Sequence, residues 1–366
     1  MKKSLLLLAV LLTALACGPK SLPLADPANF DGELYTLQTP DVVMQVTPFG
    51  ARVVTLFTRD RAGKWADIVV GHNTLAEYVT PPGERFLGAT VGPVANRIGN
   101  ATYTLDGVEW HTDPNDNVVN TLHGGFVGVD MVPWEVVSHC DTALVLRLAL
   151  PHGQAGFPGN RVFTLTYSVS GPDFRVDIEA QTDRPTPVNF THHPFFCLRG
   201  EGNGTVEDYL LTVNASAYIP IDALSIPTGE IATVEGTPFD FREPHLIGER
   251  IGGQHPQLLN GHGYDHNWCL DGTPDCCGLR SACLVEDPVS GRSIEVLTNQ
   301  PGLQIYSGNF FNGSEPGKNG KPLTFRSSMA LEAQGWPDAV NNPSFPSILL
   351  TPPDTYHSTT IYRFGR

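Results

Sequence analysis

Basic residues are scarce in this sequence. Its 366 residues contain 23 lysines and arginines against 38 aspartates and glutamates, which gives a formal net charge of −15. Acidic residues outnumber basic ones throughout, and no basic run occurs. Such a chain repels polyanions, so nucleic acids and anionic membrane surfaces are excluded as partners. The charge is instead typical of a soluble protein surface.

Low-complexity tracts, internal repeats and an evident linker are also missing from the main part of the chain. Their absence favours one domain, for which we expect residues 30–366. Long helices are excluded as well, because the 37 glycines and 31 prolines recur so often along the chain. The domain is therefore expected to be all-β and antiparallel, as a sandwich or a barrel.

A long apolar run occurs at the N-terminus, where Lys2 and Lys3 precede Leu5–Leu12. The run is too short for a comfortable membrane span. Basic residues before a short apolar run are typical of a secretion signal, which we assign to residues 1–16. Removing this segment leaves 21 basic residues against 38 acidic ones, a formal charge of −17.

Cys17 directly follows the small residue Ala16 and is similar to the cleavage site of a bacterial lipoprotein. We expect lipidation of Cys17; the alternative is plain secretion, with Cys17 removed or unmodified. Residues 17–29, which are rich in proline and small residues, are expected to form a flexible tether. The expected location is therefore outside the cytoplasm, periplasmic or anchored to a membrane by the lipid alone.

Six further cysteines remain in the mature chain: Cys140, Cys197, Cys269, Cys276, Cys277 and Cys283. In an exported protein an even number permits disulfides, whose pairing the sequence does not give. The adjacent Cys276 and Cys277 lack the two-residue gap that lets two thiolates share a zinc ion, so no structural metal is expected.

Alternating apolar residues predict strands. Tyr103–Leu105 and Val108–Trp110 flank Asp106-Gly107, which predicts a β-hairpin. The same alternation predicts strands over Ala143–Leu150, Val162–Val169 and Phe174–Ala180. One short helix is expected over Thr74–Tyr78, capped by Asn73.

Two adjacent histidines, His192 and His193, lie in the apolar stretch Val188–Phe196. The stretch is expected to be a strand that ends at a bend beside Pro194. Neighbouring side chains of a strand face opposite ways, so only one of the two histidines can face a given site. An ordinary pair, one packed and one solvated, is the alternative.

Four more stretches combine charged or imidazole groups with turn or apolar residues: 91–99 with Asn96 and Arg97, 120–125 with His123, 263–268 with Asp265, and 328–337 with Glu332. Glycines let the first two loops approach a ligand closely. Asp265 lies between aromatic residues and can accept hydrogen bonds from the hydroxyls of a polyol. Glu332 follows an apolar strand, so partial desolvation would poise it as a base. Each group also has an ordinary interpretation, as a structural arginine, a turn cap or an exposed carboxylate.

In this order and spacing, the five motifs resemble those of the aldose 1-epimerase (galactose mutarotase) family, over about Asp31 to Arg366. Further landmarks share the resemblance: Gly156–Asn160, Thr237–Phe241, Leu303–Phe310 and Tyr356–Phe364. Two departures stand out. The family usually has Asn in place of His192, and commonly Ser or Thr and then Tyr in place of Pro194 and Phe195. Because a tyrosine hydroxyl near the sugar would be lost at Phe195, we expect the substrate preference to differ.

The resemblance implies a large antiparallel β-sandwich with an open cleft, few short helices, and interconversion of the α and β anomers of a hexose without metal or organic cofactor. It implies that His193 is the general acid, Glu332 the general base and His123 an auxiliary imidazole near the ring oxygen. It further implies sugar contacts from Asn96, Arg97, Asp265, Gln304 and Phe195. The chemistry requires a partly charged His193 and an ionised Glu332. A monomer or homodimer is expected.

Two other hypotheses remain open at this point. One is a sugar-binding protein without catalysis on the same scaffold, because a fold does not guarantee a function. The other is a metal-dependent hydrolase built from His123, His193, Asp265 and Glu332, whose side chains suit zinc.

Overall fold

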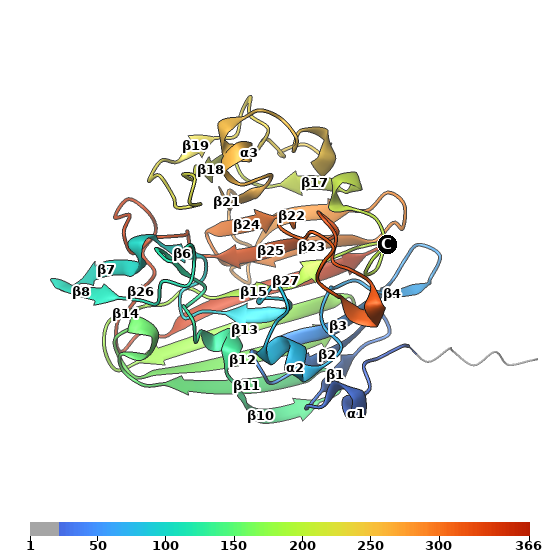
Figure 1. Cartoon of the computed structure of the whole chain (residues 1–366), viewed down its shortest axis with the longest axis horizontal. Coiled ribbons are helices and arrows are strands. Elements are labelled where there is room, and N and C mark those ends of the chain that lie inside the picture. Colours follow the sequence, from blue (N-terminus) through green and yellow to red (C-terminus); the bar gives the residue numbers. More distant parts are fainter. Residues whose placement is uncertain (1–21) are drawn as a thin grey trace, which may run out of the picture.

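The computed structural model describes residues 22–366, so the predicted secretion signal and Cys17 lie outside the described residues (Figure 1). The expected all-β architecture with few short helices is confirmed. The described α-helices are α1 (Pro27–Phe30), α2 (Leu75–Val79) and α3 (Pro256–Asn260). Single turns of 3₁₀-helix are η1 (Gly99–Ala101), η2 (Val129–Met131), η3 (Gln154–Gly156), η4 (Val206–Asp208), η5 (Ile247–Glu249) and η6 (Lys318–Gly320). Within residues 22–366, no helix has both the length and the apolar character that crossing a membrane requires.

One layer is a nine-stranded antiparallel sheet that crosses the whole molecule (Figure 1). In spatial order its strands are β10 (Glu135–Cys140), β11 (Ala143–Leu150), β12 (Arg161–Ser170), β13 (Asp173–Thr182), β27 (Tyr356–Gly365), β23 (Ser293–Thr298), β22 (Arg280–Glu286), β17 (Leu210–Val213) and β20 (His245–Leu246). Alternate residues of β12, such as Phe163, Leu165 and Tyr167, are buried while their neighbours are half-buried. One face of this sheet therefore covers the core.

The second layer combines a six-stranded and a four-stranded antiparallel sheet. The six-stranded sheet has the order β16 (Phe195–Phe196), β25 (Met329–Gln334), β24 (Gly302–Tyr306), β21 (Asp265–Cys269), β18 (Ala217–Ile219) and β19 (Ala232–Thr233). The four-stranded sheet consists of β1 (Tyr35–Gln38), β2 (Val42–Thr47), β3 (Arg52–Arg59) and β4 (Trp65–Asp67). Two-stranded ladders complete the fold: β5 (Ala89–Val91) with β15 (Thr191–His193), β6 (Arg97–Ile98) with β9 (Thr121–Leu122), β7 (Thr102–Leu105) with β8 (Val108–His111), and β14 (Thr186–Pro187) with β26 (Leu349–Leu350).

The two layers pack face to face over one large apolar core. The Tyr362 hydroxyl of β27 donates a hydrogen bond to the backbone oxygen of Leu331 in β25 across a distance of 3.1 Å, which ties the layers together. Every residue of β21, β24 and β25 is buried. One face of these strands meets the core, so the polar side chains on the other face are covered by loops instead.

The local predictions mostly agree with the structure. The hairpin forms with Leu105 opposite Val108, and β11 has the predicted bounds. The helix cap was placed one residue too early: Thr74, not Asn73, is the N-cap of α2. The reason is a capping box, in which the Thr74 hydroxyl accepts from the Glu77 N–H and the Glu77 carboxylate accepts from the Thr74 N–H.

The end of the predicted tether contacts the domain. The N–H of Ala25 donates to Oε1 of Gln45 at 2.8 Å, and Nε2 of Gln45 donates to the Ala25 oxygen at 2.9 Å. Helix α1 follows directly. The segment just before residue 30 is therefore hydrogen-bonded to strand β2.

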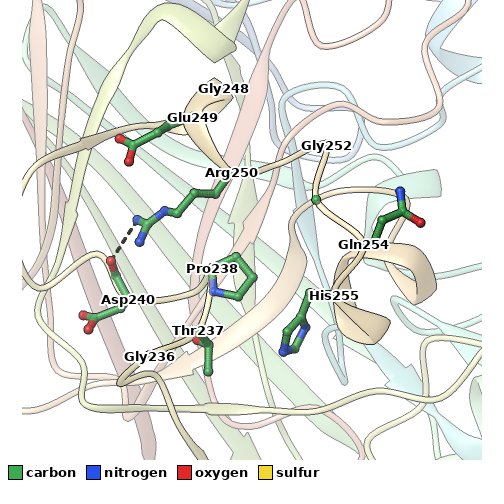
Figure 2. Close-up of a pocket in the computed structure, with 11 residues that line it drawn as sticks. Gly236, Thr237, Pro238, Asp240, Gly248, Glu249, Arg250, Gly252, Gln254 and His255 are labelled. Carbon is green, nitrogen blue, oxygen red and sulfur yellow. Dashed lines mark hydrogen bonds between the residues drawn. The ribbon is translucent and has the colours of Figure 1, made fainter.

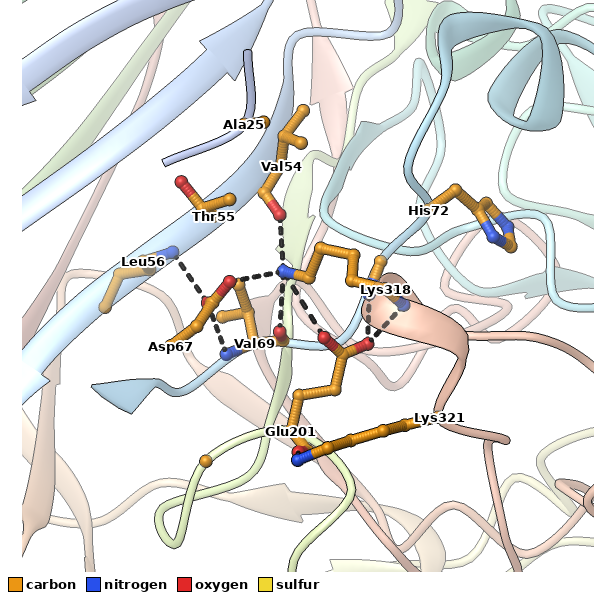
Figure 3. A network of polar contacts seen from close by, with 12 residues as sticks. Ala25, Val54, Thr55, Leu56, Asp67, Val69, His72, Glu201, Lys318 and Lys321 are labelled. Carbon is orange, nitrogen blue, oxygen red and sulfur yellow. Dashed lines mark hydrogen bonds and ion pairs between the residues drawn. The ribbon is translucent and has the colours of Figure 1, made fainter. Parts of the chain in front are cut away.

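A buried lysine fixes the long segment between β24 and β25. Figure 3 shows Nζ of Lys318 between the carboxylates of Asp67 and Glu201, at 2.7 and 3.9 Å. Nζ also donates to the backbone oxygens of Val54 and Val69. Burial disfavours the ammonium, but the two carboxylates outweigh burial and raise the pKa of Lys318. The segment is thereby clamped to the four-stranded sheet.

Candidate active site

A cleft opens where loops cover the polar face of β21, β24 and β25. Six residues predicted from the sequence line it together: Asn96, Arg97, His123, His193, Asp265 and Glu332. The cleft holds about 470 Å³ of open space including its mouth. Residues that lie up to 236 positions apart in the sequence, from Asn96 to Glu332, therefore meet in one concave site, as a small-molecule site requires.

His193 and Glu332 form the centre of the cleft. Nε2 of His193, at the end of β15, lies 3.3 Å from Oε1 of Glu332 in β25. Both side chains are almost fully buried, with 6% and 2% exposure. Within the described chain, Nδ1 of His193 and Oε2 of Glu332 have no hydrogen-bond partner. Buried polar atoms normally have partners, so the free oxygen Oε2 of Glu332 is suited to meet a ligand.

Burial disfavours a charge on either member of this pair. It lowers the pKa of His193 to about 3 and raises the pKa of Glu332 well above the ordinary glutamate value, with Asp265 and Glu84 adding to the latter rise. Burial thus favours the form of the ligand-free pair with its proton on the carboxyl group over the charged imidazole and carboxylate that we expected. Transfer of this proton to Nε2 turns the pair into the expected acid and base without exchange with solvent.

His123 is held by an unusual backbone geometry. Its Nδ1 accepts a hydrogen bond from the Asn96 N–H at 3.0 Å, and its own N–H donates to the Asn96 oxygen at 3.0 Å. Both residues have positive φ, 52° and 59°, a conformation that is concentrated at functional sites. Gly124 follows with φ 89°, and a Cβ there would lie 2.1 Å from the Gly92 oxygen, so only glycine fits.

Because Nδ1 of His123 accepts a hydrogen bond, the proton of the neutral ring belongs on Nε2. Burial lowers the pKa of His123 well below the ordinary value, so the ring is neutral at pH 7. The His123 and His193 rings meet edge to face at 5.3 Å. His123 therefore presents a neutral N–H donor beside the His193–Glu332 pair.

Two further polar pairs line or support the cleft. Nε2 of Gln304 donates to Oδ1 of Asp265 at 2.7 Å, and burial raises the pKa of Asp265. Gln304 supports the wall from β24, next to Glu332 in the ladder. On the other side, Nε of Arg97 donates to Oδ2 of Asp116 at 3.0 Å, which orients the guanidinium. The cleft thus offers both hydrogen-bond donors and acceptors to a polyol.

The remaining residues of the histidine stretch face the core. His192 is 2% exposed and packs among Tyr167, Phe174 and Tyr362, so the predicted divergence of the two histidines is present. Phe195 is fully buried behind His193, with the ring centres 4.8 Å apart. It supports the His193 ring and is not part of the cleft wall described above.

Sequence reasoning missed part of the wall: Glu84, Phe86, Leu122, Tyr306 and Phe310. The Phe86 ring stacks on His193 at 5.9 Å and meets His123 at 4.6 Å, so it fixes both imidazoles. Tyr306 falls in the Leu303–Phe310 landmark. It lies two residues after Gln304 in a strand, so both side chains face the same side, and this spacing could have predicted Tyr306 at the cleft. Glu84 lies in a turn with no such pattern.

Among the described residues, His123, His193 and Glu332 bring potential metal-ligand atoms within 4.8 Å of one another. A histidine ligand needs a free ring nitrogen. In His123 one nitrogen accepts from Asn96 and the other then carries the proton, whereas metal-bound histidines donate their second N–H. The trio therefore fits a metal poorly.

The six described cysteines are all free thiols.

A larger surface hollow, with about 1280 Å³ of open space including its mouth, lies elsewhere, beside α3 (Figure 2). Its charged groups are engaged with protein partners: Arg250 donates to the Asp240 oxygen, the Asp240 carboxylate binds Arg242, and Glu249 meets His245. No acid–base pair like His193–Glu332 lines this part of the described chain. The smaller cleft is therefore the better candidate for chemistry.

The chain is similar to several known proteins. A sequence profile of the family described as "Aldose 1-epimerase" matches residues 33–363. Galactose mutarotase of Rattus norvegicus is 39% identical over 335 residues, covering 91% of this chain and 94% of the relative. Aldose 1-epimerase of Escherichia coli is 37% identical over 283 residues, covering 76% and 80%.

Solved structures give the same result. An aldose epimerase homologue from C. elegans has a TM-score of 0.82 at 26% identity, covering 91% of this chain and 99% of that one. Galactose 1-epimerase from Lactobacillus acidophilus has a TM-score of 0.77 at 27% identity, covering 90% and 93%. The fold is therefore a β-sandwich of the galactose mutarotase type.

Proposed function

Since the chain belongs to the aldose 1-epimerase family and is an isomerase, we propose that it interconverts the α and β anomers of hexoses by acid–base ring opening at the cleft. The observation that carries the mechanism is the contact between His193 and Glu332. It places an acid and a base 3.3 Å apart in a buried site, each with an unpartnered atom.

Ring opening needs two proton transfers. Glu332 as carboxylate removes the proton of the C1 hydroxyl, and His193 donates the proton on Nε2 to the ring oxygen. The C1–ring oxygen bond breaks as the C1 carbonyl forms. Rotation about the C1–C2 bond and closure with reversed roles then give the other anomer. The active form arises when the proton of the pair moves from the carboxyl to the imidazole.

The other groups hold and polarise the sugar. His123 presents its Nε2–H as a neutral donor toward the ring oxygen region. Asp265, oriented by Gln304, accepts from hydroxyls, and Arg97, oriented by Asp116, donates to them. Asn96 acts by fixing His123. Preorganised groups of this kind lower the barrier because they need no reorientation during the reaction.

The test is anomer exchange of freshly dissolved α-glucose and α-galactose, followed by polarimetry or proton NMR with and without a strong chelator. We expect acceleration with at least one sugar in both conditions. Sugar binding measured by calorimetry without faster exchange would instead support the non-catalytic sugar-binding protein. Anomer exchange that is lost with chelator and restored by zinc would show that the reaction needs a metal and would contradict this proposal.

The N-terminal pattern supports a further proposal on location: the enzyme is exported and anchored through lipidated Cys17. There it would prepare sugars released from polysaccharides for an anomer-selective transporter or enzyme. Mass spectrometry of the mature N-terminus is the measurement. A diacylglyceryl-modified Cys17 is expected, and an unmodified mature N-terminus would contradict anchoring. Unchanged growth on such sugars after deletion of the signal would contradict the physiological role.

A further inference from the structure

Glu84 is a third carboxylate in the cleft beside Asp265 and Glu332, and the mechanism above does not use it. It lies in the turn that leads to β5. Its Oε1 accepts a hydrogen bond from the Phe86 N–H at 2.9 Å, and its own N–H donates to Oε2 of Glu315 at 2.9 Å. The side chain is therefore held by its own turn, and the backbone of that turn is held by Glu315, at the wall of the cleft.

The carboxylate of Glu84 retains capacity for a ligand. Its partners in the described chain are backbone N–H groups of its own turn, those of Phe86 and Arg85. An ionised carboxylate offers about four acceptor positions, so two of them remain. Burial raises the pKa of Glu84 to about 7, with Glu315 adding to the rise, as expected of a carboxylate short of donors.

The charges around the cleft favour an uncharged ligand that donates hydrogen bonds. Glu84, Asp265 and Glu332 supply the acidic groups, while Arg97 is already paired with Asp116 and both imidazoles are neutral at pH 7. A hydroxyl donates to a carboxylate, whereas a sugar carboxylate or phosphate would be repelled. Tyr306 and Phe310 lie on the same wall and supply apolar surface.

We propose that Glu84 is a specificity-determining sugar contact, whose carboxylate accepts a hydrogen bond from one hydroxyl of the aldose other than the C1 hydroxyl. The inference rests on the proposed function, because it concerns the substrate of the same cleft. A site that hydrogen-bonds a hydroxyl discriminates against analogues that lack it, since the half-buried acceptor is then left unpaired.

The experiment compares kcat/KM of the wild type, Glu84→Ala and Glu84→Gln for glucose and its 2-, 3-, 4- and 6-deoxy analogues. In the wild type, loss of the contacted hydroxyl is expected to reduce kcat/KM about tenfold to hundredfold. In Glu84→Ala, kcat/KM for glucose is expected to fall by a similar factor. For the analogue that lacks the contacted hydroxyl, kcat/KM is expected to fall far less. Circular dichroism establishes that each variant is folded, and Glu84→Gln keeps the side-chain volume and an acceptor for the Phe86 N–H.

Glu315→Gln is the matched control. This substitution perturbs the same turn, because Glu315 accepts the hydrogen bond from the Glu84 N–H. Glu315 itself does not line the cleft. A structural role of Glu84 would lower kcat/KM for all five sugars by the same factor, as we expect for Glu315→Gln. If kcat/KM falls by the same factor for all five sugars in Glu84→Ala and in Glu84→Gln, this inference is wrong, while the proposed function stands. A wild type that accelerates no parent aldose would overturn the proposed function together with it.

Discussion

Replacement of His192 by phenylalanine should stabilise the protein at acidic pH relative to neutral pH. His192 lies in the core with both ring nitrogens lacking a partner within residues 22–366. Its ring packs against Tyr167, Phe174 and Tyr362 at centre distances of 5.4, 5.5 and 5.9 Å. Phenylalanine preserves these ring contacts and removes the two nitrogens.

The magnitude follows from linkage. Burial, together with the neighbouring His193, lowers the pKa of His192 to about 3, against about 6.5 for an unfolded histidine. Above pH 6.5 neither state binds the proton, so the group contributes no pH dependence. Below pH 6.5 the unfolded state alone binds it, and stability falls until about pH 3. At pH 5 this loss amounts to about 2 kcal/mol, which the variant avoids.

The assay is urea unfolding of the wild type and His192→Phe at pH 8 and pH 5 without sugar. The free energy of unfolding of the variant minus that of the wild type should be about 2 kcal/mol larger at pH 5 than at pH 8, because the variant keeps the stability that the wild type loses. Anomer exchange should be retained, because His192 faces away from the cleft. An equal difference at both pH values would refute the conclusion that His192 is buried in its neutral form.

Two further predictions concern charge. Because burial lowers the pKa of His193 to about 3, kcat/KM of a Glu84→Gln background, which removes the near-neutral carboxyl of Glu84, should show no acid limb near pH 6.5. An acid limb centred near 6.5 would mean that the imidazole titrates as if exposed. Lys318→Met leaves the buried Glu201 and the half-buried Asp67 without their cation and should cost about 3–5 kcal/mol of unfolding free energy; a loss below about 1 kcal/mol in urea unfolding would show that the clamp is dispensable.

The strands could be predicted because their side-chain pattern is local. β11 has the predicted bounds, since apolar residues alternate over its whole length. Alternation also gave the opposite orientations of His192 and His193. The helix cap shows the limit of such rules: Asn73 and Thr74 are both good N-caps, and the reciprocal bonds of Glu77 to Thr74 decide between them.

The cleft could be predicted only in part. Its central residues were found through motif order, but their contacts depend on the register between strands distant in sequence, such as Gln304 next to Glu332. Glu84 enters the wall because its turn is held by Glu315, more than 200 residues away. The opposite pKa shifts of His193 and Glu332 likewise follow from burial, which the sequence does not specify.

The central claim is that His193 and Glu332 transfer protons as one unit. The most direct measurement is the rate of anomer exchange of α-glucose and α-galactose in the wild type, His193→Asn, Glu332→Gln and the double variant. Each single variant should lose about 10² to 10⁴ in kcat, and the double variant should lose little more than either one. Losses that multiply in the double variant would show that the residues act independently, and near wild-type rates in either single variant would contradict its assigned role.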